Sequence, residues 1–328
     1  METQTTTKRR SRMRRQQTAK RIELTPRDIE ILLLLNRYRY LRSSHVHQLV
    51  GGKSKRRFIE RLGHLYHEGG YVNRPVAQWQ AVNARYMPAV YELGEAGEQV
   101  LAARGLAQID SPLLHRGRGN GFLFHHELMV SDILSSIEIG IRARRDLRFI
   151  SWQEILARAP PAVRHSGTPF ELPVSIAHQF SSRREICDKP VNPDAVFGIE
   201  YAVEGQKSYR FFALEADRSS EPVYRSNLQQ SSYLRKILQY REIIRRQTYT
   251  AHLGLPNLFV LTVTTDARHL ANILSLVNEL SQGKGNTFLL FKTMPSLASL
   301  ETAPPPSPFI LTAPWQRAGF PDLCIGQP

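Results

Sequence analysis

The sequence is poor in cysteine and lacks any long apolar run. Its 328 residues include two cysteines, Cys187 and Cys324, which are too few for a disulfide framework and typical of the reducing cytoplasm. No stretch reaches the ~18 apolar residues of a membrane span. The sequence also contains no Gly-x-x-x-x-Gly-Lys-Ser/Thr loop, the phosphate loop of an ATP-driven motor. We therefore expect a cytoplasmic protein that makes no use of a membrane.

Acidic residues are scarce relative to basic ones. The chain has 44 Lys and Arg against 29 Asp and Glu, a formal net charge of +15. Such an excess indicates a polyanionic partner, most simply nucleic acid, unless the basic residues are scattered for solubility. Apolar residues make up 41% of the chain, enough for a packed core. Because a single core rarely grows beyond ~250 residues, this length favours two domains.

The basic residues gather first at the N-terminus. Residues 1–22 carry eight Lys or Arg and almost nothing apolar, so we expect a disordered arm. The arm is expected to lie on DNA phosphates, with a solvated tail as the alternative. The arm residues assigned to DNA are Arg9, Arg10, Arg14 and Arg15.

Residues 23–105 have the pattern of a small helical domain. Thr25-Pro26-Arg27-Asp28 is a helix start, with Thr25 as N-cap and Asp28 at the capping-box position. Apolar spacing and glycine stops predict helices at 25–40, 43–50, 54–67 and 94–105, and two strand-like runs at 71–80 and 85–93.

The third helix is basic on one face. This order of helices and a hairpin is the winged helix-turn-helix pattern, in which a helix about 10–12 Å wide enters the major groove of DNA. The alternative is a helical domain with a solvated basic face. The residues expected to contact duplex DNA are Lys53, Lys55, Arg56, Arg57 and Arg61.

A second domain is expected after a linker at 106–121, which is rich in Gly and Arg. Residues 122–295 alternate helical and strand patterns, which predicts an α/β sandwich with a mixed sheet. The tail at 296–328 is rich in proline and is expected to be extended or loosely packed. The fold class is thus α+β, a winged helix followed by an α/β sandwich.

Two acids lie on strands that are expected to be neighbours. Asp194 begins one strand and Glu215 ends the next, so a hairpin would bring both carboxylates to one edge of the sheet. Two hard oxygen ligands can hold Mg²⁺, which keeps waters on its other sites. Such a water, with its lowered pKa, can attack a phosphodiester. Asp194 and Glu215 are therefore candidate metal ligands.

Over residues 122–295 the chain resembles the PD-(D/E)xK nuclease-like fold, in which Pro-Asp precedes a (D/E)-x-K strand. The resemblance implies a catalytic role for Asp194 and Glu215, with Glu127 on the first helix as a third acid. The sequence departs from the pattern at Asp217, which stands where the lysine belongs. Lys236 on the next helix is the implied substitute, because the lysine of this fold can migrate there.

The combined motifs narrow the resemblance. They are LTPRDIEILLLL, Tyr91-Glu92-Leu93-Gly94 with Gly97, Pro193-Asp194, Leu214-Glu215-Ala216-Asp217-Arg218, and Lys236 with Tyr240. Over about residues 24–295 the chain is similar to the replication-relaxation family of plasmids and other mobile elements. This implies a role in plasmid replication or DNA relaxation, with double-stranded DNA and plasmid replication or mobilisation proteins as partners.

Three functional hypotheses stay open from the sequence. The first is a Mg²⁺-dependent DNA endonuclease or nickase. The second is a non-enzymatic replication or copy-number regulator with a degenerate nuclease-like domain, which Asp217 favours. The third is an accessory protein that only positions DNA for a relaxase. A homodimer is also open, since many winged-helix proteins dimerise, although no heptad seam is present.

Overall fold

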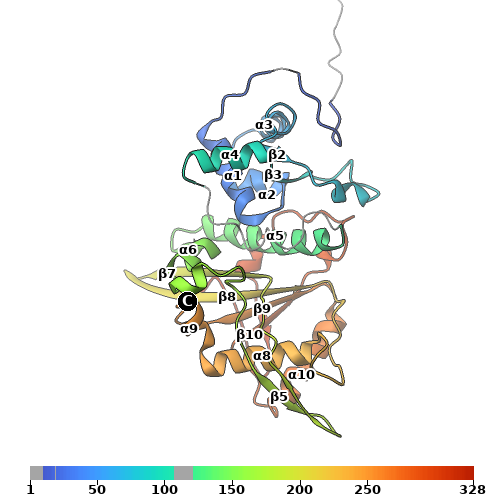
Figure 1. The fold of residues 1–328 in the computed structure, drawn as a ribbon, viewed down its shortest axis with the longest axis vertical. Helices are drawn as coiled ribbons and strands as arrows, with labels where there is room; N and C mark the ends of the chain where they lie inside the picture. The colour runs from blue at the N-terminus through green and yellow to red at the C-terminus, as the bar shows by residue number, and fades with distance from the viewer. Residues whose placement is uncertain (1–9, 19, 107–120) are drawn as a thin grey trace, which may run out of the picture. The chain divides into compact units, whose positions relative to one another are not determined.

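The computed structural model describes residues 10–18, 20–106 and 121–328, and the chain divides into two compact units, residues 1–124 and 125–328 (Figure 1). The predicted linker lies almost entirely outside the described residues, as does Arg9. The two units are considered separately below. In the part of the chain that the structure describes, no helix is both long and apolar enough to cross a bilayer.

The N-terminal unit has helices and a small antiparallel sheet, as the sequence predicts. Its elements are α1 (Pro26–Tyr38), β1 (Leu41–Arg42), α2 (Ser43–Val50), α3 (Lys55–His67), β2 (Val72–Asn73), the 3₁₀ helix η1 (Val76–Gln80), β3 (Val90–Leu93) and α4 (Glu95–Ala103). The strands are ordered β1-β3-β2. At the start of α1, Thr25 and Asp28 form the predicted capping box. Behind it, Leu32, Leu35 and Leu62 are fully buried and form the core.

The predicted hairpin is much shorter than expected. Of the run 71–80, only β2 pairs with β3, and η1 follows at once. Pro75 has no N–H to donate to a ladder, which disfavours a longer strand. The buried side chain of Gln78 takes over part of the pairing. Its amide donates to the carbonyls of Pro75 and Val90 at 3.0 Å and accepts from Val90 N at 2.9 Å.

Part of the predicted disordered arm is ordered on the N-terminal unit. Glu68, at the end of α3, accepts hydrogen bonds from Thr18 N and Thr18 Oγ1, both at 2.8 Å, and pairs with Arg10. Arg15 Nε donates to the carbonyl of Tyr66 at 2.8 Å. Arg10, Arg12 and Arg15 thus find acceptors on the folded unit, which composition alone does not reveal.

The C-terminal unit is built on a seven-stranded mixed sheet, which confirms the predicted mixed α and β architecture. The strand order is β12-β11-β10-β9-β8-β7-β4, with β8, β9 and β10 parallel and the other pairs antiparallel. Its strands are β4 (Leu147–Ile150), β7 (Ala195–Val203), β8 (Gln206–Asp217), β9 (Phe259–Thr264), β10 (Leu289–Thr293), β11 (Trp315–Arg317) and β12 (Phe320–Leu323).

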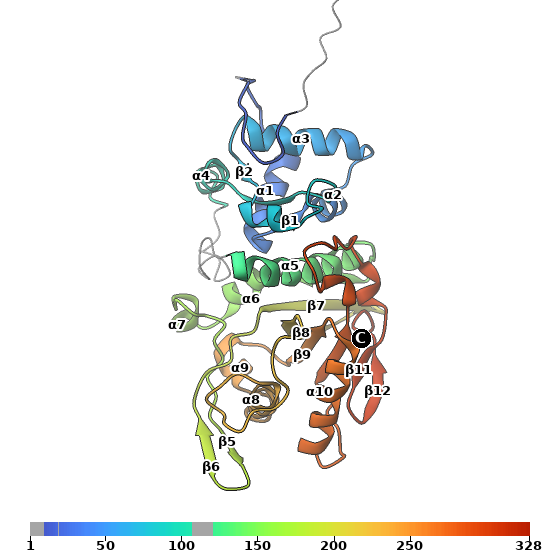
Figure 2. The same ribbon diagram turned by 90° about the vertical axis from the view of Figure 1, so that its right-hand side faces the viewer.

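Helices cover both faces of this sheet. In Figure 2, α5 lies on one side, and α8 and α10 lie on the other. The helices of the unit are α5 (Gly121–Arg142), α6 (Trp152–Arg158), α7 (Pro161–Arg164), α8 (Tyr233–Arg246), α9 (Thr248–Leu253) and α10 (Ala267–Leu280), with short 3₁₀ turns η2 (Pro295–Leu297) and η3 (Pro308–Leu311). A separate two-stranded ribbon consists of β5 (Ile176–Gln179) and β6 (Arg184–Cys187).

The prediction of a loosely packed C-terminal tail is wrong. Residues 296–328 supply β11 and β12, which extend the sheet, and Trp315 and Ile325 are fully buried. The prolines do not prevent this. Pro321 lies in β12 at the edge of the sheet, where a strand tolerates a missing N–H.

Candidate functional site

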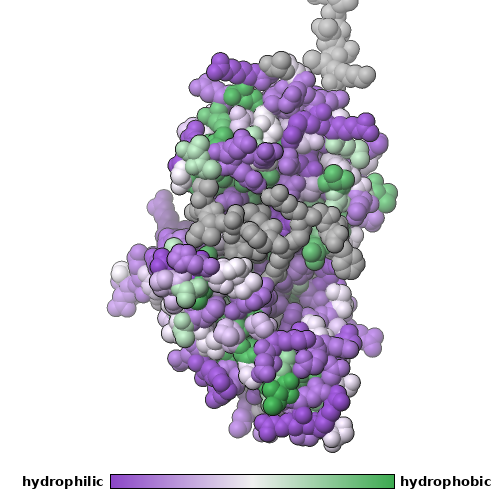
Figure 3. Space-filling model, in the orientation of Figure 1, coloured by the Kyte–Doolittle hydropathy of each residue, from purple (hydrophilic) through white to green (hydrophobic). Residues whose placement is uncertain are grey.

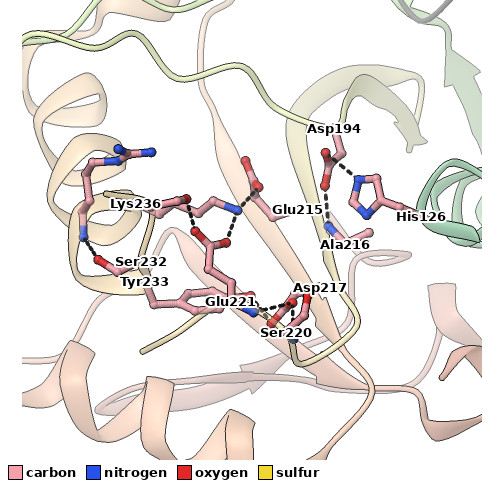
Figure 4. A network of polar contacts seen from close by, with 12 residues as sticks. His126, Asp194, Glu215, Ala216, Asp217, Ser220, Glu221, Ser232, Tyr233 and Lys236 are labelled. Atoms are coloured by element: carbon pink, nitrogen blue, oxygen red, sulfur yellow. Dashed lines mark hydrogen bonds and ion pairs between the residues drawn. The ribbon is translucent and has the colours of Figure 1, made fainter. Parts of the chain in front are cut away.

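A cluster of charged side chains lies at one end of β7 and β8. These strands are antiparallel, with Ala195 opposite Leu214, and Asp194 N donates to the carbonyl of Leu214 at 3.0 Å. This register places Asp194 beside Glu215. Lys236 reaches the cluster from the first turns of α8 (Figure 4). The structure therefore brings together the three residues that the sequence singles out from separate elements.

Asp194 is held by donors from α5 and β8. Its Oδ1 lies 3.0 Å from His126 Nε2, on α5, and its Oδ2 accepts from Ala216 N at 2.8 Å. Burial alone would raise the pKa of Asp194, but the bond to His126 and the charges of His126 and Lys236 outweigh it and lower that pKa. Burial likewise lowers the pKa of His126, yet Asp194 and Glu215 outweigh it, so its pKa is raised. The pair therefore favours a charged imidazolium against a carboxylate.

Glu215 is almost completely buried, with 4% of its surface exposed. Its Oε2 accepts from Lys236 Nζ at 2.9 Å and its Oε1 from Tyr240 Oη at 2.5 Å. Burial raises the pKa of Glu215, and Lys236 opposes that rise. Lys236 also pairs with Glu221 at 2.7 Å. Burial would lower the pKa of Lys236, but the surrounding carboxylates outweigh it and raise that pKa, so the side chain is an ammonium.

Asp217 does not take the place of the missing lysine in this cluster. Its Oδ2 lies 2.9 Å from His269 Nε2 on α10 and accepts from Tyr233 Oη on α8 at 3.2 Å. Its Oδ1 accepts from the backbone N–H groups of Ser220 at 3.1 Å and Glu221 at 3.4 Å. Asp217 therefore joins the end of β8 to two helices and to the turn that follows. Figure 4 shows Asp217 beside Ser220 and Tyr233.

The sequence indicates some partners of the cluster but not others. α5 reaches Asp194 with His126, and the role of Glu127, the next residue of α5, stays a prediction. Glu221 and His269 were not expected near the cluster. Glu221 comes from an irregular segment and His269 from the start of α10, 52 residues after Asp217, so neither carries a local sequence signal.

The observed arrangement does not fit a divalent cation on Asp194 and Glu215. All four oxygens of these carboxylates accept hydrogen bonds, and the Lys236 ammonium lies between Glu215 and Glu221. Among residues 10–18, 20–106 and 121–328, no group of three or more His, Cys, Asp or Glu side chains is arranged to hold a metal ion. Magnesium binding therefore stays a prediction from the sequence.

The tyrosines of the cluster are donors rather than nucleophiles in this arrangement. Tyr233 and Tyr240 are both 2% exposed. Burial and the nearby carboxylates raise the pKa of each phenol well above its usual value. A phenolate, the form that attacks a phosphodiester, is disfavoured at both positions.

In the N-terminal unit, the start of α3 carries exposed basic residues. They are Lys53, Lys55, Arg56 and Arg57. Ser54 caps the helix by accepting from Arg57 N at 3.3 Å, and Phe58 and Leu62 bury the opposite face. Arg56 pairs with Glu60, but both side chains are largely exposed, so this surface pair contributes little stability.

The other residues that the sequence predicts to contact DNA are Arg61 and the arginines of the arm, and most of them are bound to groups of the protein itself. Arg61 donates to Asp28, which is 1% exposed, and to the carbonyl of Glu23. Arg61 therefore links α3 to the start of α1 and is not part of the exposed basic surface at the start of α3. Arg10 and Arg15 hold the arm on the unit, whereas Arg14 is exposed.

A family model described as replication-relaxation matches residues 32–258, about two thirds of the chain. This range includes α3, Asp194, Glu215 and Lys236. Comparisons with curated proteins and with solved structures found no match.

Proposed function

The chain belongs to the replication-relaxation family, and we propose that it is a duplex-DNA-binding protein of a plasmid or other mobile element. The family assignment supports a role in replication or relaxation. The proposal adds that the N-terminal unit is a winged helix. In it, α3 is the recognition helix, and the segment 74–89 between β2 and β3 is the wing.

The observation that carries the proposal is the division of α3 into two faces. Phe58, Leu62 and Leu65 are buried, whereas Lys55 and Arg57 are exposed at the start of the same helix. Within the described residues, the side chains of Lys55 and Arg57 make no hydrogen bond or ion pair with the protein. Free cations at the N-terminal end of a helix are what phosphate and guanine contacts in a major groove require.

The test is duplex binding by Lys55→Ala combined with Arg57→Ala. We expect about a 10- to 100-fold loss of affinity, since each lost contact costs roughly 1 kcal/mol or more. Fluorescence anisotropy with a labelled duplex measures it. The matched control is Arg245→Ala with Arg246→Ala, which removes the same charge from residues paired with Glu242. Equal affinities of the α3 variant and wild type would contradict the proposal.

A second candidate function is phosphodiester cleavage in the C-terminal unit. The observation in its favour is that Asp194, Glu215 and Lys236 meet at one edge of the sheet. The occupied carboxylate oxygens and the absence of a lysine at Asp217 favour the competing hypothesis, a non-enzymatic replication or copy-number regulator. In that case the cluster stabilises the fold by joining β7, β8 and α8.

Supercoiled plasmid incubated with Mg²⁺ or Mn²⁺ separates the two candidates. The proteins to compare are wild type, Asp194→Asn and Glu215→Gln. Open circles from wild type alone would establish a nuclease and locate its site. Equal nicking by all three would place the activity elsewhere or in a contaminant. Plasmid that is bound but stays supercoiled, which we expect from the hydrogen-bonded carboxylates, would establish the regulator.

A further inference from the structure

The start of α1 lies against the turn that leads into α3. Arg27, on the first turn of α1, places its guanidinium against the backbone of Gly52. A Cβ atom at position 52 would lie 3.3 Å from Arg27 Nη1 and 3.9 Å from Arg27 Cζ. We call this place the α1–α3 junction and define it by Arg27, Gly52, Lys53 and Arg57.

Arg27 lies on the same side of α3 as Arg57. Asp28, the next residue of α1, accepts from Arg61 Nε at 2.9 Å. Arg57 lies one helical turn before Arg61, and residues four apart are neighbours on the surface of a helix. Since Arg27 contacts the turn before α3 and Asp28 contacts Arg61, the start of α1 runs along this side of the helix. Arg27 and Arg57 therefore belong to one surface.

Arg27 is a cation without an acidic partner. Its side chain is exposed, and within residues 10–18, 20–106 and 121–328 it has no hydrogen bond or ion pair. A guanidinium presents five N–H donors in a fixed plane. The charge of Arg27 is therefore left for a ligand, in contrast to that of Arg61, which is bound to Asp28.

The acids near the junction do not cancel its charge. Asp28 is 1% exposed and is bound to Arg61. Glu23 and Glu30 lie close to Arg27 in the chain, and in the described structure neither of them pairs with it. The junction and Lys55 supply four cations against these two acids. The surface therefore stays positive.

The glycine at position 52 makes room for Arg27. The φ angle of Gly52 is +135°, a conformation that only glycine adopts readily, and a side chain there would also press on the guanidinium. The φ angle of Gly51 is +69°, but a Cβ atom at that position would meet nothing within 4 Å. Gly51 thus serves the turn alone, whereas Gly52 serves both the turn and the position of Arg27.

The occupant that fits the junction is a phosphate group. Residues 51–57 are all exposed and consist of Gly, Ser, Lys and Arg, so an apolar partner finds no side chain to pack against. Hydrophilic residues also predominate on the face of the N-terminal unit that Figure 3 shows. A planar guanidinium binds two phosphate oxygens at once. Because Arg27 lies beside the helix assigned to the major groove, the backbone of the same duplex is the nearest source of phosphate.

We propose that the α1–α3 junction binds a backbone phosphate of duplex DNA through Arg27 and thereby fixes the position of α3 in the groove. Phosphate contacts set the orientation of a protein on the duplex, whereas contacts with base edges read the sequence. The inference rests on the proposed function and deepens it, since it adds a positioning residue from α1 to the surface of α3.

The test is anisotropy of the full chain with labelled duplexes of different sequence, at a series of KCl concentrations. Arg27→Ala is expected to weaken binding about 5- to 10-fold for every duplex and to lower the slope of log affinity against log salt by about 0.9. Arg27→Lys keeps the charge and should keep most of the slope. The matched control is Arg104→Ala, which removes an exposed arginine at the end of α4 and should change neither value.

The two glycines provide an independent readout. Gly52→Ala is expected to displace the guanidinium and to lower the slope, as Arg27→Ala does. Gly51→Ala strains the same turn without meeting a side chain, so its slope should stay that of wild type. Thermal melts establish that each variant is folded. Equal slopes for the two glycine variants would overturn the role of Gly52 in placing Arg27.

A free anion is the other source of phosphate, and melting of wild type with inorganic phosphate tests it. Stabilisation by phosphate that Arg27→Ala removes, together with unchanged duplex affinity of that variant, would assign the junction to a free anion and overturn the inference. Unchanged duplex affinity and slope in Arg27→Ala without such stabilisation would overturn it as well.

The result is separable from that of the proposed function. Duplex binding that is lost on removal of Lys55 and Arg57 but kept in Arg27→Ala would overturn the junction inference alone. Duplex binding that is weakened by Arg27→Ala but kept on removal of Lys55 and Arg57 would overturn the α3 proposal and support the junction.

Discussion

At the residue scale, the cluster is a chain of alternating charges. His126 neutralises Asp194, and Lys236 lies between Glu215 and Glu221. Each carboxylate is largely removed from water, so each depends on its cation for stability. A variant that removes one cation therefore leaves an uncompensated buried charge, and the effect must depend on pH.

His126→Gln tests this dependence. The pKa of His126 is raised above its ordinary 6.5, so its charge stabilises the fold fully below that pH and is lost as pH rises through the raised value. The pKa of Asp194 is lowered below 3.8, so its charge contributes above that pH and is lost on acidification. The contribution of the His126–Asp194 pair to the free energy of unfolding is therefore largest between the lowered pKa of Asp194 and the raised pKa of His126. We expect His126→Gln to lose about 1–2 kcal/mol of unfolding free energy near pH 5.5 and less near pH 9.

Urea unfolding, followed by the fluorescence of buried Trp152 and Trp315, measures the difference. The control is His165→Gln, because His165 is exposed. A destabilisation of His126→Gln that is equal at both pH values would show that the imidazole is neutral in the folded protein.

At the element scale, residues 10–18 and α3 stabilise each other through the end of the helix. The hydrogen bonds from Thr18 N and Thr18 Oγ1, together with Arg10, lower the pKa of Glu68 to about 2 against the opposing effect of burial. Burial and nearby arginines lower the pKa of His67 to about 4. A neutral His67 is required, because its Nδ1 accepts from Gln16 N at 3.1 Å.

Glu68→Gln should release residues 10–18 from α3. The variant loses the charge-assisted bonds to Thr18 and Arg10, so we expect cleavage of native protein by trypsin after Arg12 and Arg14 to become faster. Timed digestion with mass spectrometry measures it. Glu60→Gln is the control, since Glu60 pairs with the exposed Arg56. Cleavage rates that are the same in both variants would contradict the role of Glu68.

At the scale of the whole molecule, some of the basic residues that make up the net charge of +15 are paired with acids of the protein itself. Arg61 is committed to Asp28, Arg10 to Glu68, and Lys236 to Glu215. Charges that are neutralised within the protein release no counterions from DNA. The salt dependence of duplex binding should therefore follow the free cations of α3 rather than the total charge.

The measurement is duplex affinity at a series of KCl concentrations. Removing Lys55 and Arg57 should lower the slope of log affinity against log salt by about 1.8, at roughly 0.9 per phosphate contact. Removing Arg245 and Arg246, which are paired with Glu242, should leave the slope close to that of wild type. Equal losses from both pairs would mean that binding follows net charge alone.

Local patterns in the sequence predicted the elements whose causes are local. Thr25 and Asp28 form a capping box because the two residues lie within one helical turn. Asp194 and Glu215 could be placed together because β7 and β8 form a hairpin, whose register aligns their ends. The position of Lys236 in the cluster could be predicted only from the resemblance to a nuclease-like fold, because its spacing in the sequence does not by itself place it beside a strand.

What the sequence determined by itself was the order of most helices and strands, the mixed architecture of the second unit and the excess of positive charge. Only the tertiary structure decided which charges are free. Arg61 faces Asp28 from 33 residues away, and Asp217 meets His269 from 52 residues away. The proline-rich tail enters the sheet because Trp315 finds an apolar site there. Such partners are chosen by packing between elements far apart in the chain, which no local periodicity records.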